Sequence, residues 1–336
     1  MNRKSWCLVA IGGLLATAQA PAAAQATQIY GQVRMTVNKV RTGNTTNLTE
    51  LRDNASRLGF RGGEDLGGGA AALFGLEMGL DADTGAATTP NFRHSYVGLR
   101  GGWGTFAAGR LDSANPTGSP LYSQVTGIVS FAANDAGATA IGTSILNARN
   151  RTSNSLGYRS PEWGGFDVRA RYYMRGAPAT PDTENGAKSL DLGLNYNAGA
   201  LRAGIGYGKD TRPGGLLANE LSHKWQAGLR YDLGAFEPYL LVGRDIFNNN
   251  ATSRHEVDYW IAGTRWSQNA HAVVLNVMRR DVLTSRTGER RRWQLAYTYA
   301  LSKRTELQVF IDRDGVDSSR SNVAVRALGA GVRHDF

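Results

Sequence analysis

The sequence predicts an all-β protein, a 16-stranded antiparallel transmembrane β-barrel. Three observations support this fold class. Apolar and polar residues alternate with a period of two from Gln28 onward, as strands with one apolar face require. The connections between the alternating segments are short and long in turn, and aromatic residues gather beside the short ones. Together these features are typical of an up-and-down barrel with tight turns at one rim and loops at the other.

The composition excludes two other classes of protein. The chain has 336 residues, of which 41% are hydrophobic and 20% are charged. That is too apolar for a disordered chain. After the N-terminal segment no run of about 18 apolar residues occurs, so transmembrane helices are excluded as well. The formal net charge is +10, and 32 of the 38 basic residues are arginine.

The N-terminus has the features of a secretion signal. A short basic start is followed by an apolar stretch at residues 7–15 and then by small residues up to Ala26. We expect residues 1–26 to be a signal peptide, cleaved after Ala24 or Ala26, and residues 27–336 to form the barrel domain. Cleavage after Ala26 removes the only cysteine, so the exported chain has no disulfide.

Sixteen segments alternate, and each has roughly 7 to 14 residues, close to the 9–11 of a membrane-spanning strand. In the clearest segment, Phe166 and Val168 share one face while Asp167 and Arg169 share the other. The segments begin near residues 28, 56, 70, 92, 103, 151, 165, 189, 201, 223, 236, 257, 271, 291, 304 and 323.

Seven connections are short turns and eight are long, polar and rich in Asn, Thr, Asp and Gly. The long ones lie near residues 39–55, 81–91, 111–150, 176–188, 210–222, 245–256, 281–290 and 313–322. A soluble β-sandwich also has alternating strands, but its polar face rarely carries runs of glycine. Here that face holds Gly193, Gly204, Gly206 and Gly208. Aromatic residues such as Trp103 beside the short turns are typical of an interfacial girdle, which favours the membrane barrel.

Five stretches, taken in order, carry a family resemblance: residues 29–31, 56–69, 96–110, 154–161 and 331–336. Together they resemble the Gram-negative general porin family in its β-proteobacterial and neisserial branch. The resemblance implies a homotrimer in the outer membrane, with a long third loop folded into the pore. It also implies that the terminal Phe336 is the signal read by the outer-membrane assembly machinery.

The face that would line the pore is predominantly basic. Where the alternation is readable it carries twelve basic residues, Arg34, Arg57, Arg61, Arg151, Arg159, Arg169, Arg171, Arg202, Lys224, Arg230, Arg292 and Arg333, against six acidic ones, Glu77, Asp167, Asp191, Glu306, Asp312 and Asp335. A pore lined by one sign of charge favours the opposite ion, so we expect anion selectivity. The alternative is that these arginines pair with acidic residues and leave only a weak positive electric field in the pore.

The segment 111–150 is too long for an ordinary connector, and the resemblance implies that it narrows the pore. By the same resemblance, Arg57, Arg93 and Arg151 match the wall arginines that face this loop, and Asp135 is the main acid on it. The alternation places Arg57 and Arg151 on the pore face but leaves Arg93 ambiguous. We expect Arg34, Arg61, Arg169 and Arg171 to line the rest of the pore.

Three other functions compete with a general porin: a channel specific for small anionic solutes, an adhesin that binds through its loops, and a barrel enzyme that uses His271. The five histidines show no metal-binding spacing, so no metal, cofactor or catalytic residue is expected. The basic run 290–292 has no aromatic stacking platform, which argues against nucleic acid and favours lipopolysaccharide phosphates. The expected partners are therefore further copies of the chain, outer-membrane lipid, the assembly machinery and small hydrophilic solutes.

Overall fold

The structure is a computed structural model of the chain. It describes residues 24–44, 46–112, 117–129, 149, 151–174, 186–250, 253–282, 288–318 and 321–336. Its elements are β1 (Ala24–Thr42), β2 (Thr46–Asp53), β3 (Ser56–Gly67), β4 (Ala70–Asp81), β5 (Ala86–Gly101), β6 (Gly104–Leu111), α1 (Pro120–Ile128), β7 (Thr152–Arg159), β8 (Phe166–Tyr173), β9 (Lys188–Ala198), β10 (Leu201–Thr211), β11 (Leu221–Tyr231), β12 (Phe236–Asn248), β13 (Arg254–Gln268), β14 (His271–Asp281), β15 (Gly288–Ala300), β16 (Thr305–Ser318) and β17 (Ser321–Asp335). The expected signal peptide lies outside the described residues, except for its last three, which begin β1.

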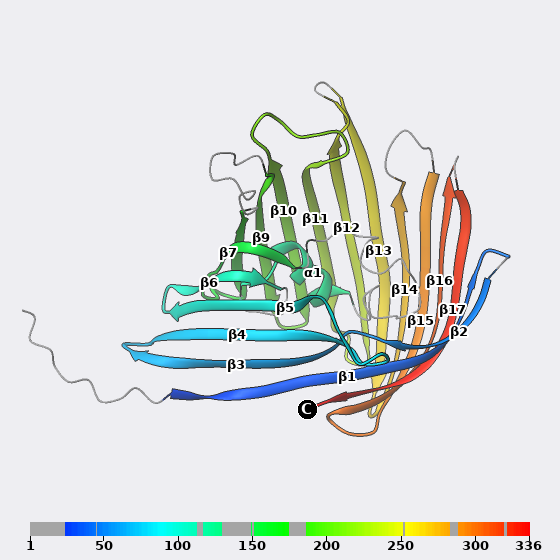
Figure 1. Ribbon diagram of the computed structural model, residues 1–336, viewed down its shortest axis with the longest axis horizontal. Helices are drawn as coiled ribbons and strands as arrows, with labels where there is room; N and C mark the ends of the chain where they lie inside the picture. Colours follow the sequence, from blue (N-terminus) through cyan, green and yellow to red (C-terminus); the bar gives the residue numbers. More distant parts are fainter. Residues whose placement is uncertain are drawn as a thin grey trace, which may run out of the picture.

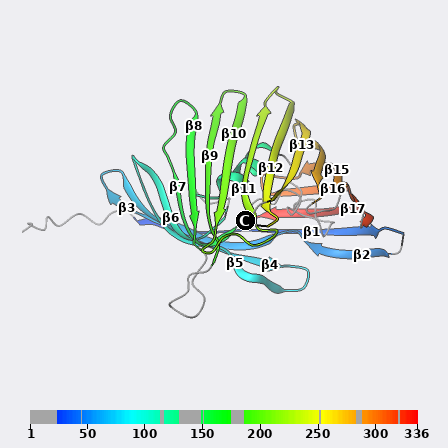
Figure 2. The same cartoon turned by 90° about the horizontal axis from the view of Figure 1, so that it is seen from above.

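One antiparallel sheet closes on itself. From β3 to β17 each strand pairs with the next along the chain, and β17 returns to pair with β1 from Gln32↔Asp335 to Thr42↔Val325. Figure 1 shows β1 and β17 side by side at this seam, and Figure 2 shows the same closure from above. The all-β prediction is confirmed, and the sheet is a barrel.

The 17 labelled strands make a 16-stranded barrel, because β2 and β3 share one position in the sheet. Both pair with the same edge of β1, β3 with its first half and β2 with its second. The break between them is at Asn54 and Ala55, where Ala55 has a left-handed φ of 66°. The predicted strand number is therefore confirmed.

The observed strands are longer than predicted at the loop rim. The predicted loops 39–55, 81–91 and 313–322 are wrong as loops, because each contains paired strand residues and a short hairpin connection. The physical reason lies in the environment of these strand ends. Beyond the apolar band both faces of a strand meet polar surroundings, so the period-two pattern of hydrophobicity fades although the ladder continues.

The barrel is apolar outside and polar inside. Ile29, Val37 and Leu328 are more than half exposed on the outer face, whereas Asn38 and Asp312 are completely buried on the inner face. This is the reverse of a water-soluble protein and matches a wall between lipid and an aqueous interior. Among the described residues, no helix combines the length and the apolar character needed to cross a membrane.

The single helix among the described residues, α1, lies in the long segment 111–150. Ser119 caps its N-terminus, because the Ser119 hydroxyl accepts a hydrogen bond of 3.2 Å from the backbone N–H of Tyr122. Pro120 takes the first helical position, where its missing N–H costs nothing. The cap and the proline together explain why a helix begins at this point of the segment.

Candidate functional site

Helix α1 lies on a patch of the inner wall that has almost no side chains. A Cβ atom added at Gly193 would lie 2.8 Å from Cβ of Pro120, and one at Gly206 would lie 2.7 Å from Cδ2 of Leu121. At Gly204 an added Cβ would lie 2.9 Å from Nε2 of Gln124. A side chain at Gly193 would collide with the ring of Pro120, and one at Gly204 or Gly206 would force the side chains of Gln124 and Leu121 to move, so glycine suits these three pore-facing positions. We call these three residues the glycine patch.

Polar contacts fix the helix on the glycine patch. Gln226 of β11 donates from Nε2 to the carbonyl oxygen of Leu121 at 2.6 Å and to Oε1 of Gln124 at 3.0 Å. Gln124 in turn donates to Oδ1 of Asn195 on β9 at 3.4 Å. Gln226 is fully buried, and its Oε1 accepts from the hydroxyl of Tyr259 at 3.4 Å, so losing the bonds to the helix would leave its amide NH2 group without an acceptor.

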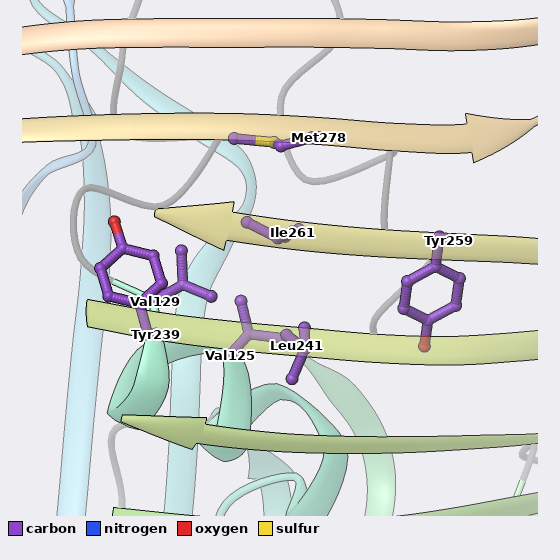
Figure 3. Packing of buried hydrophobic residues seen from close by; sticks show 7 residues of the cluster. All are labelled: Val125, Val129, Tyr239, Leu241, Tyr259, Ile261 and Met278. Atoms are coloured by element: carbon purple, nitrogen blue, oxygen red, sulfur yellow. The ribbon is translucent and has the colours of Figure 1, made fainter. Parts of the chain in front are cut away.

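An apolar cluster holds the far side of the helix. Val125 and Val129 of the loop pack on inner-face residues of β12, β13 and β14, namely Tyr239, Leu241, Tyr259, Ile261 and Met278 (Figure 3). All seven are nearly or fully buried. Sequence reasoning missed this cluster, because Leu240 and Val242 on the outer face merge with Leu241 into one apolar run.

The end of the same segment is bound to the wall by ion pairs. Arg149 pairs with Asp191 of β9 and with Asp210 of β10, and its carbonyl oxygen accepts a hydrogen bond of 2.8 Å from Arg171. Both described ends of the segment 111–150 therefore contact the inner face of the barrel. Asp135, the predicted acid on this loop, lies outside the described residues.

Two of the three predicted constriction arginines meet at one carboxylate. Glu77 of β4 accepts a hydrogen bond of 2.6 Å at Oε1 from Nε of Arg93, and Nε of Arg57 lies 3.7 Å from its Oε2. A β-bulge turns Arg93 inward: Glu77 pairs with His94 while the next residue of β4 pairs with Phe92, so Arg93 is the extra residue. The bulge resolves the ambiguity that the alternation leaves.

The third arginine joins the same group through a second carboxylate. Nε of Arg151 lies 2.8 Å from Oδ2 of Asp112. Glu77, His94 and Asp112 each offer one potential metal-ligating atom, and these atoms lie within 4.8 Å of one another. Because both carboxylates are bound to arginines, we assign no metal to this triad. Three arginines and two carboxylates thus form one group, which we call the arginine cluster.

In the arginine cluster, the arginine side chains are more exposed than the two carboxylates. The side chains of Arg57, Arg93 and Arg151 are 29%, 15% and 26% exposed. Those of Glu77 and Asp112 are only 5% and 4% exposed. The carboxylates lie behind the guanidinium groups, so an ion in the barrel meets the arginines first.

The four predicted pore-lining arginines fall into different surroundings on the inner face. Arg34 is buried and donates to Oε1 of Gln308. Arg61 is exposed, with its guanidinium 4.9 Å from the ring centre of Tyr30. Arg169 pairs with Asp167. Arg171 is only 1% exposed beneath the end of the loop, so its charge does not face the pore directly.

Further ion pairs lie on the inner wall, as the alternative of paired arginines expects. Lys224 lies 3.0 Å from Asp245, which also accepts from Arg280 at 2.8 Å. Arg290 and Arg292 pair with Asp314 and Asp312. Asp245 and Asp314 are missing from the six acidic residues predicted on the pore-lining face, because they lie in segments that were predicted to be loops. Arg290 and Arg292 are therefore wall residues, and of the run 290–292 only Arg291 faces outward.

His271, the residue that a barrel enzyme would use, lies between two tyrosines. It lies exposed on β14, and its Nδ1 is 2.8 Å from the hydroxyl of Tyr297. Its ring also lies beside Tyr299, with 5.0 Å between ring centres. These contacts with aromatic residues are those of a histidine at a membrane interface.

Phe336 lies at the seam of the barrel. Its backbone N–H donates to the carbonyl oxygen of Gly31, and its carbonyl accepts from the N–H of Gly31, both at 3.1 Å. Its ring covers Gly31, where an added Cβ would be 2.7 Å from Cε2 of the phenylalanine. The last residue thus completes the pairing of the two ends of the sheet.

Comparison with known proteins identifies the family to which this closed barrel belongs. A family model described as Gram-negative porin matches residues 9–319. The chain belongs to the Gram-negative porin family. Among curated porins, major outer membrane protein P.IB of Neisseria gonorrhoeae is 35% identical over 193 residues, which cover 55% of this chain and 51% of that protein. The matched region thus spans about half the length of such relatives.

Two further comparisons extend the family relationship. Outer membrane porin protein 32 of Delftia acidovorans is 31% identical over 222 residues, covering 63% of this porin and 62% of that protein. The solved structure of an anion-selective porin from Comamonas acidovorans superposes with a TM-score of 0.70 over 93% of this chain and 100% of that one, at 22% identity. The similarity to the Comamonas structure establishes a shared fold.

Proposed function

We propose that this porin is a water-filled channel in the outer membrane through which small hydrophilic solutes and ions diffuse passively, with a preference for anions. The observation that carries the selectivity is the arginine cluster, in which three accessible guanidinium groups cover two buried carboxylates. The name of the Comamonas porin, anion-selective, is in line with this proposal. No catalytic activity is part of it.

The physical basis of the proposed anion preference is the excess of positive charge in the arginine cluster. Two unit charges about 4 Å apart interact with about 1 kcal/mol in bulk water and with several times that where the effective dielectric constant is lower. An anion near Arg57, Arg93 and Arg151 is therefore attracted by more than the thermal energy. A cation is repelled by a similar amount.

The test is the reversal potential of single channels in a planar bilayer under a chloride gradient. We expect the wild-type channel to prefer chloride, and the triple variant Arg57→Gln, Arg93→Gln, Arg151→Gln to lose most of that preference. The difference should be largest in dilute salt, because the Debye length falls from about 10 Å at 0.1 M to about 3 Å at 1 M.

Arg333→Gln is the matched control for this test. Arg333 is also on the inner face and is 39% exposed, but it pairs with Asp335 beside the short turns and is not in the arginine cluster. Its replacement should leave selectivity unchanged. A wild-type channel that prefers potassium, or a triple variant with wild-type selectivity, would overturn the proposal.

A channel specific for a small anionic solute is the second candidate. It is favoured by the same cluster, because several guanidinium groups around one point suit a carboxylate or phosphate group. The two candidate functions differ in how the conductance depends on the concentration of the solute. Chloride conductance that is blocked saturably by one organic anion favours the specific channel, whereas conductance proportional to concentration for many solutes favours the general porin.

We also propose a homotrimer that contacts lipopolysaccharide and depends on the outer-membrane assembly machinery. The outer faces near Ile29, Val33 and Val332 are apolar and exposed, as a face for other protomers or lipid requires. Mild detergent extraction should give a species about three times the mass of the heat-denatured chain. A monomer in several mild detergents would contradict the trimer.

A further inference from the structure

Tyr30 and Tyr96 lie on the inner wall next to the arginine cluster, on its short-turn side. Tyr30 of β1 is opposite Gly59 of β3, and Gly59 follows Arg57 by two residues. Tyr96 of β5 follows Arg93 by three residues. The residue before Tyr30 and the residue after Tyr96 are 65% and 63% exposed on the outer face, so the two tyrosine side chains lie on the pore side of the sheet.

Each of the two tyrosine rings covers a position of the wall that has no side chain. A Cβ atom added at Gly59 would collide with the ring of Tyr30, and one added at Gly75 of β4 would collide with the ring of Tyr96. The hydroxyl of Tyr30 lies 3.3 Å from Nε2 of His94, and the ring centres of His94 and Tyr96 are 5.7 Å apart. The three rings therefore adjoin one another, and we call them the aromatic floor.

The aromatic floor is open to the interior of the barrel, unlike a second group of tyrosines that is built in the same way. Tyr239 and Tyr259 also cover glycines of the inner wall. They belong to the apolar cluster at helix α1, and each is only 3% exposed. Tyr30 and Tyr96, in contrast, are partly exposed. A solute in the pore can therefore reach these two rings.

Guanidinium groups lie at both ends of the aromatic floor. Arg57 and Arg93 of the arginine cluster lie toward the loop rim. Arg61 lies toward the short turns, and its guanidinium is 4.9 Å from the ring centre of Tyr30. The carboxylate of Glu77 is also close, but its side chain is only 5% exposed and pairs with both arginines of the cluster. An anion that approaches from the pore therefore meets guanidinium groups before it meets Glu77.

We propose that the arginine cluster and the aromatic floor together bind small aromatic carboxylates on their way through the pore. The carboxylate pairs with Arg57 and Arg93, and the ring stacks on Tyr30 and Tyr96. The spacing suits such a solute, since two residues of a strand, from Arg57 to the position opposite Tyr30, span roughly 7 Å. Charge-assisted hydrogen bonds hold the carboxylate, and contacts between rings add attraction beyond the area that they bury.

The inference rests on the proposed function and adds to it a preference among organic anions. It applies to a general porin and to a specific channel alike. A site on the route of permeation must also release its solute, so we expect weak, reversible binding.

The experiment compares two acids of the same charge as blockers of the wild-type channel in planar bilayers, in chloride at neutral pH. Benzoate has an aromatic ring, whereas cyclohexanecarboxylate has a saturated ring with the same number of carbon atoms. We expect benzoate to halve the chloride current at a concentration about tenfold lower, which corresponds to about 1.4 kcal/mol. Benzyl alcohol, which has the aromatic ring but no charge, should block much more weakly than benzoate.

Substitution of the two tyrosines locates this preference. The double variant Tyr30→Leu, Tyr96→Leu keeps an apolar side chain at each position but removes both aromatic rings, so the two acids should block it at nearly equal concentrations. The double variant Tyr30→Phe, Tyr96→Phe keeps the rings and should keep the wild-type preference. The matched control Tyr173→Leu changes a partly exposed tyrosine on the inner face of β8, three strands away from β5, and should keep it as well.

Three results would overturn the proposal. These are equal blocking concentrations of the two acids in the wild-type channel, an undiminished preference for benzoate in the leucine double variant, and equal block by benzyl alcohol and benzoate. If the leucine double variant does not fold, Tyr30→Leu alone should reduce the preference about threefold. The comparison of the two acids in the wild-type channel needs no variant.

Chloride selectivity is the measurement that separates this inference from the proposed function. The leucine double variant should keep the wild-type reversal potential in a chloride gradient, because no charge has changed. A chloride-selective channel without a preference for benzoate contradicts this inference alone. A wild-type channel that prefers potassium contradicts the proposed anion preference, whereas the comparison of benzoate with cyclohexanecarboxylate still tests the aromatic floor by itself.

Discussion

Arg93 donates a hydrogen bond of 2.6 Å from Nε to Oε1 of Glu77. The same carboxylate lies 3.7 Å from Nε of Arg57, so one buried acid restrains two guanidinium groups of the arginine cluster. This arrangement sets both the geometry and the strength of the positive field. In the proposed anion-selective channel, Glu77 therefore moderates the preference that the three arginines create.

Replacing Glu77 by glutamine should strengthen the preference for anions. The change raises the charge balance of the arginine cluster from three against two to three against one, while the amide oxygen still accepts from Arg93. An interaction of about 1 kcal/mol corresponds to a chloride-to-potassium permeability ratio about five-fold higher in dilute salt. Reversal potentials measure this ratio. Glu306→Gln, which removes an inner-face carboxylate beside the short turns, is the control, and an unchanged ratio in Glu77→Gln would refute the prediction.

Gly206→Val should lower the single-channel conductance. The new side chain would occupy the space of Leu121 and push α1 off the glycine patch toward the centre of the pore. Overpacking of this kind costs about 1–3 kcal/mol, which a closed barrel tolerates. Gly315→Ala is the control, because its Cβ would meet Ala324 at an ordinary 3.7 Å. A folded Gly206→Val channel with wild-type conductance would mean that the helix does not limit the current.

Arg149→Met should release the end of the loop and increase current fluctuations of the open channel. Arg149 binds Asp191 and Asp210 at once, and removing one partner of a largely buried pair costs roughly 3 kcal/mol. Planar-bilayer recordings at fixed voltage report the fluctuations. The control is Arg212→Gln, which breaks the pair with Glu220 in the connection between β10 and β11. Equally quiet channels in both variants would show that this anchor is dispensable.

Deleting Phe336 should impair barrel assembly far more than Phe336→Tyr. The deletion removes two backbone hydrogen bonds with Gly31 and the ring that covers it, and each unsatisfied backbone group in lipid costs several kcal/mol. The tyrosine variant keeps the backbone and an aromatic ring. The fraction of heat-modifiable folded porin in purified outer membranes measures assembly. Normal levels of the deletion variant would show that neither the signal nor the seam needs this residue.

The fold was predictable from the sequence because a membrane barrel imposes one simple pattern. Lipid outside and water inside force alternation in every strand, and this pattern correctly placed Arg57, Glu77 and Arg151 on the inner face. It left Arg93 ambiguous, because a β-bulge shifts the alternation by one residue without changing the composition. Strand ends such as Val40 to Thr42 were read as loop for a related reason: outside the apolar band, hydrophobicity no longer distinguishes the two faces.

The interior of the site was less predictable than the wall. The glycines of β9 and β10 were recognised as unusual on a polar face, but only the position of α1 shows what they accommodate. Leu241 and Ile261 are flanked in the sequence by apolar residues that face outward. The alternation of hydrophobicity therefore does not reveal the apolar patch that they form inside the barrel. Pairing of Arg171 with Asp191 joins β8 to β9, and contacts between strands depend on register, which the alternation alone does not fix.

The glycine patch has a consequence for how this porin can be re-engineered. The backbone ladder that closes the barrel runs past Gly193, Gly204 and Gly206 without using the loop. Helix α1 is therefore an insert seated on a stretch of wall that lacks side chains, separate from the strands that close the barrel. Replacement loops with new charges can be exchanged there as a module, provided that each presents a small, flat face to the three glycines.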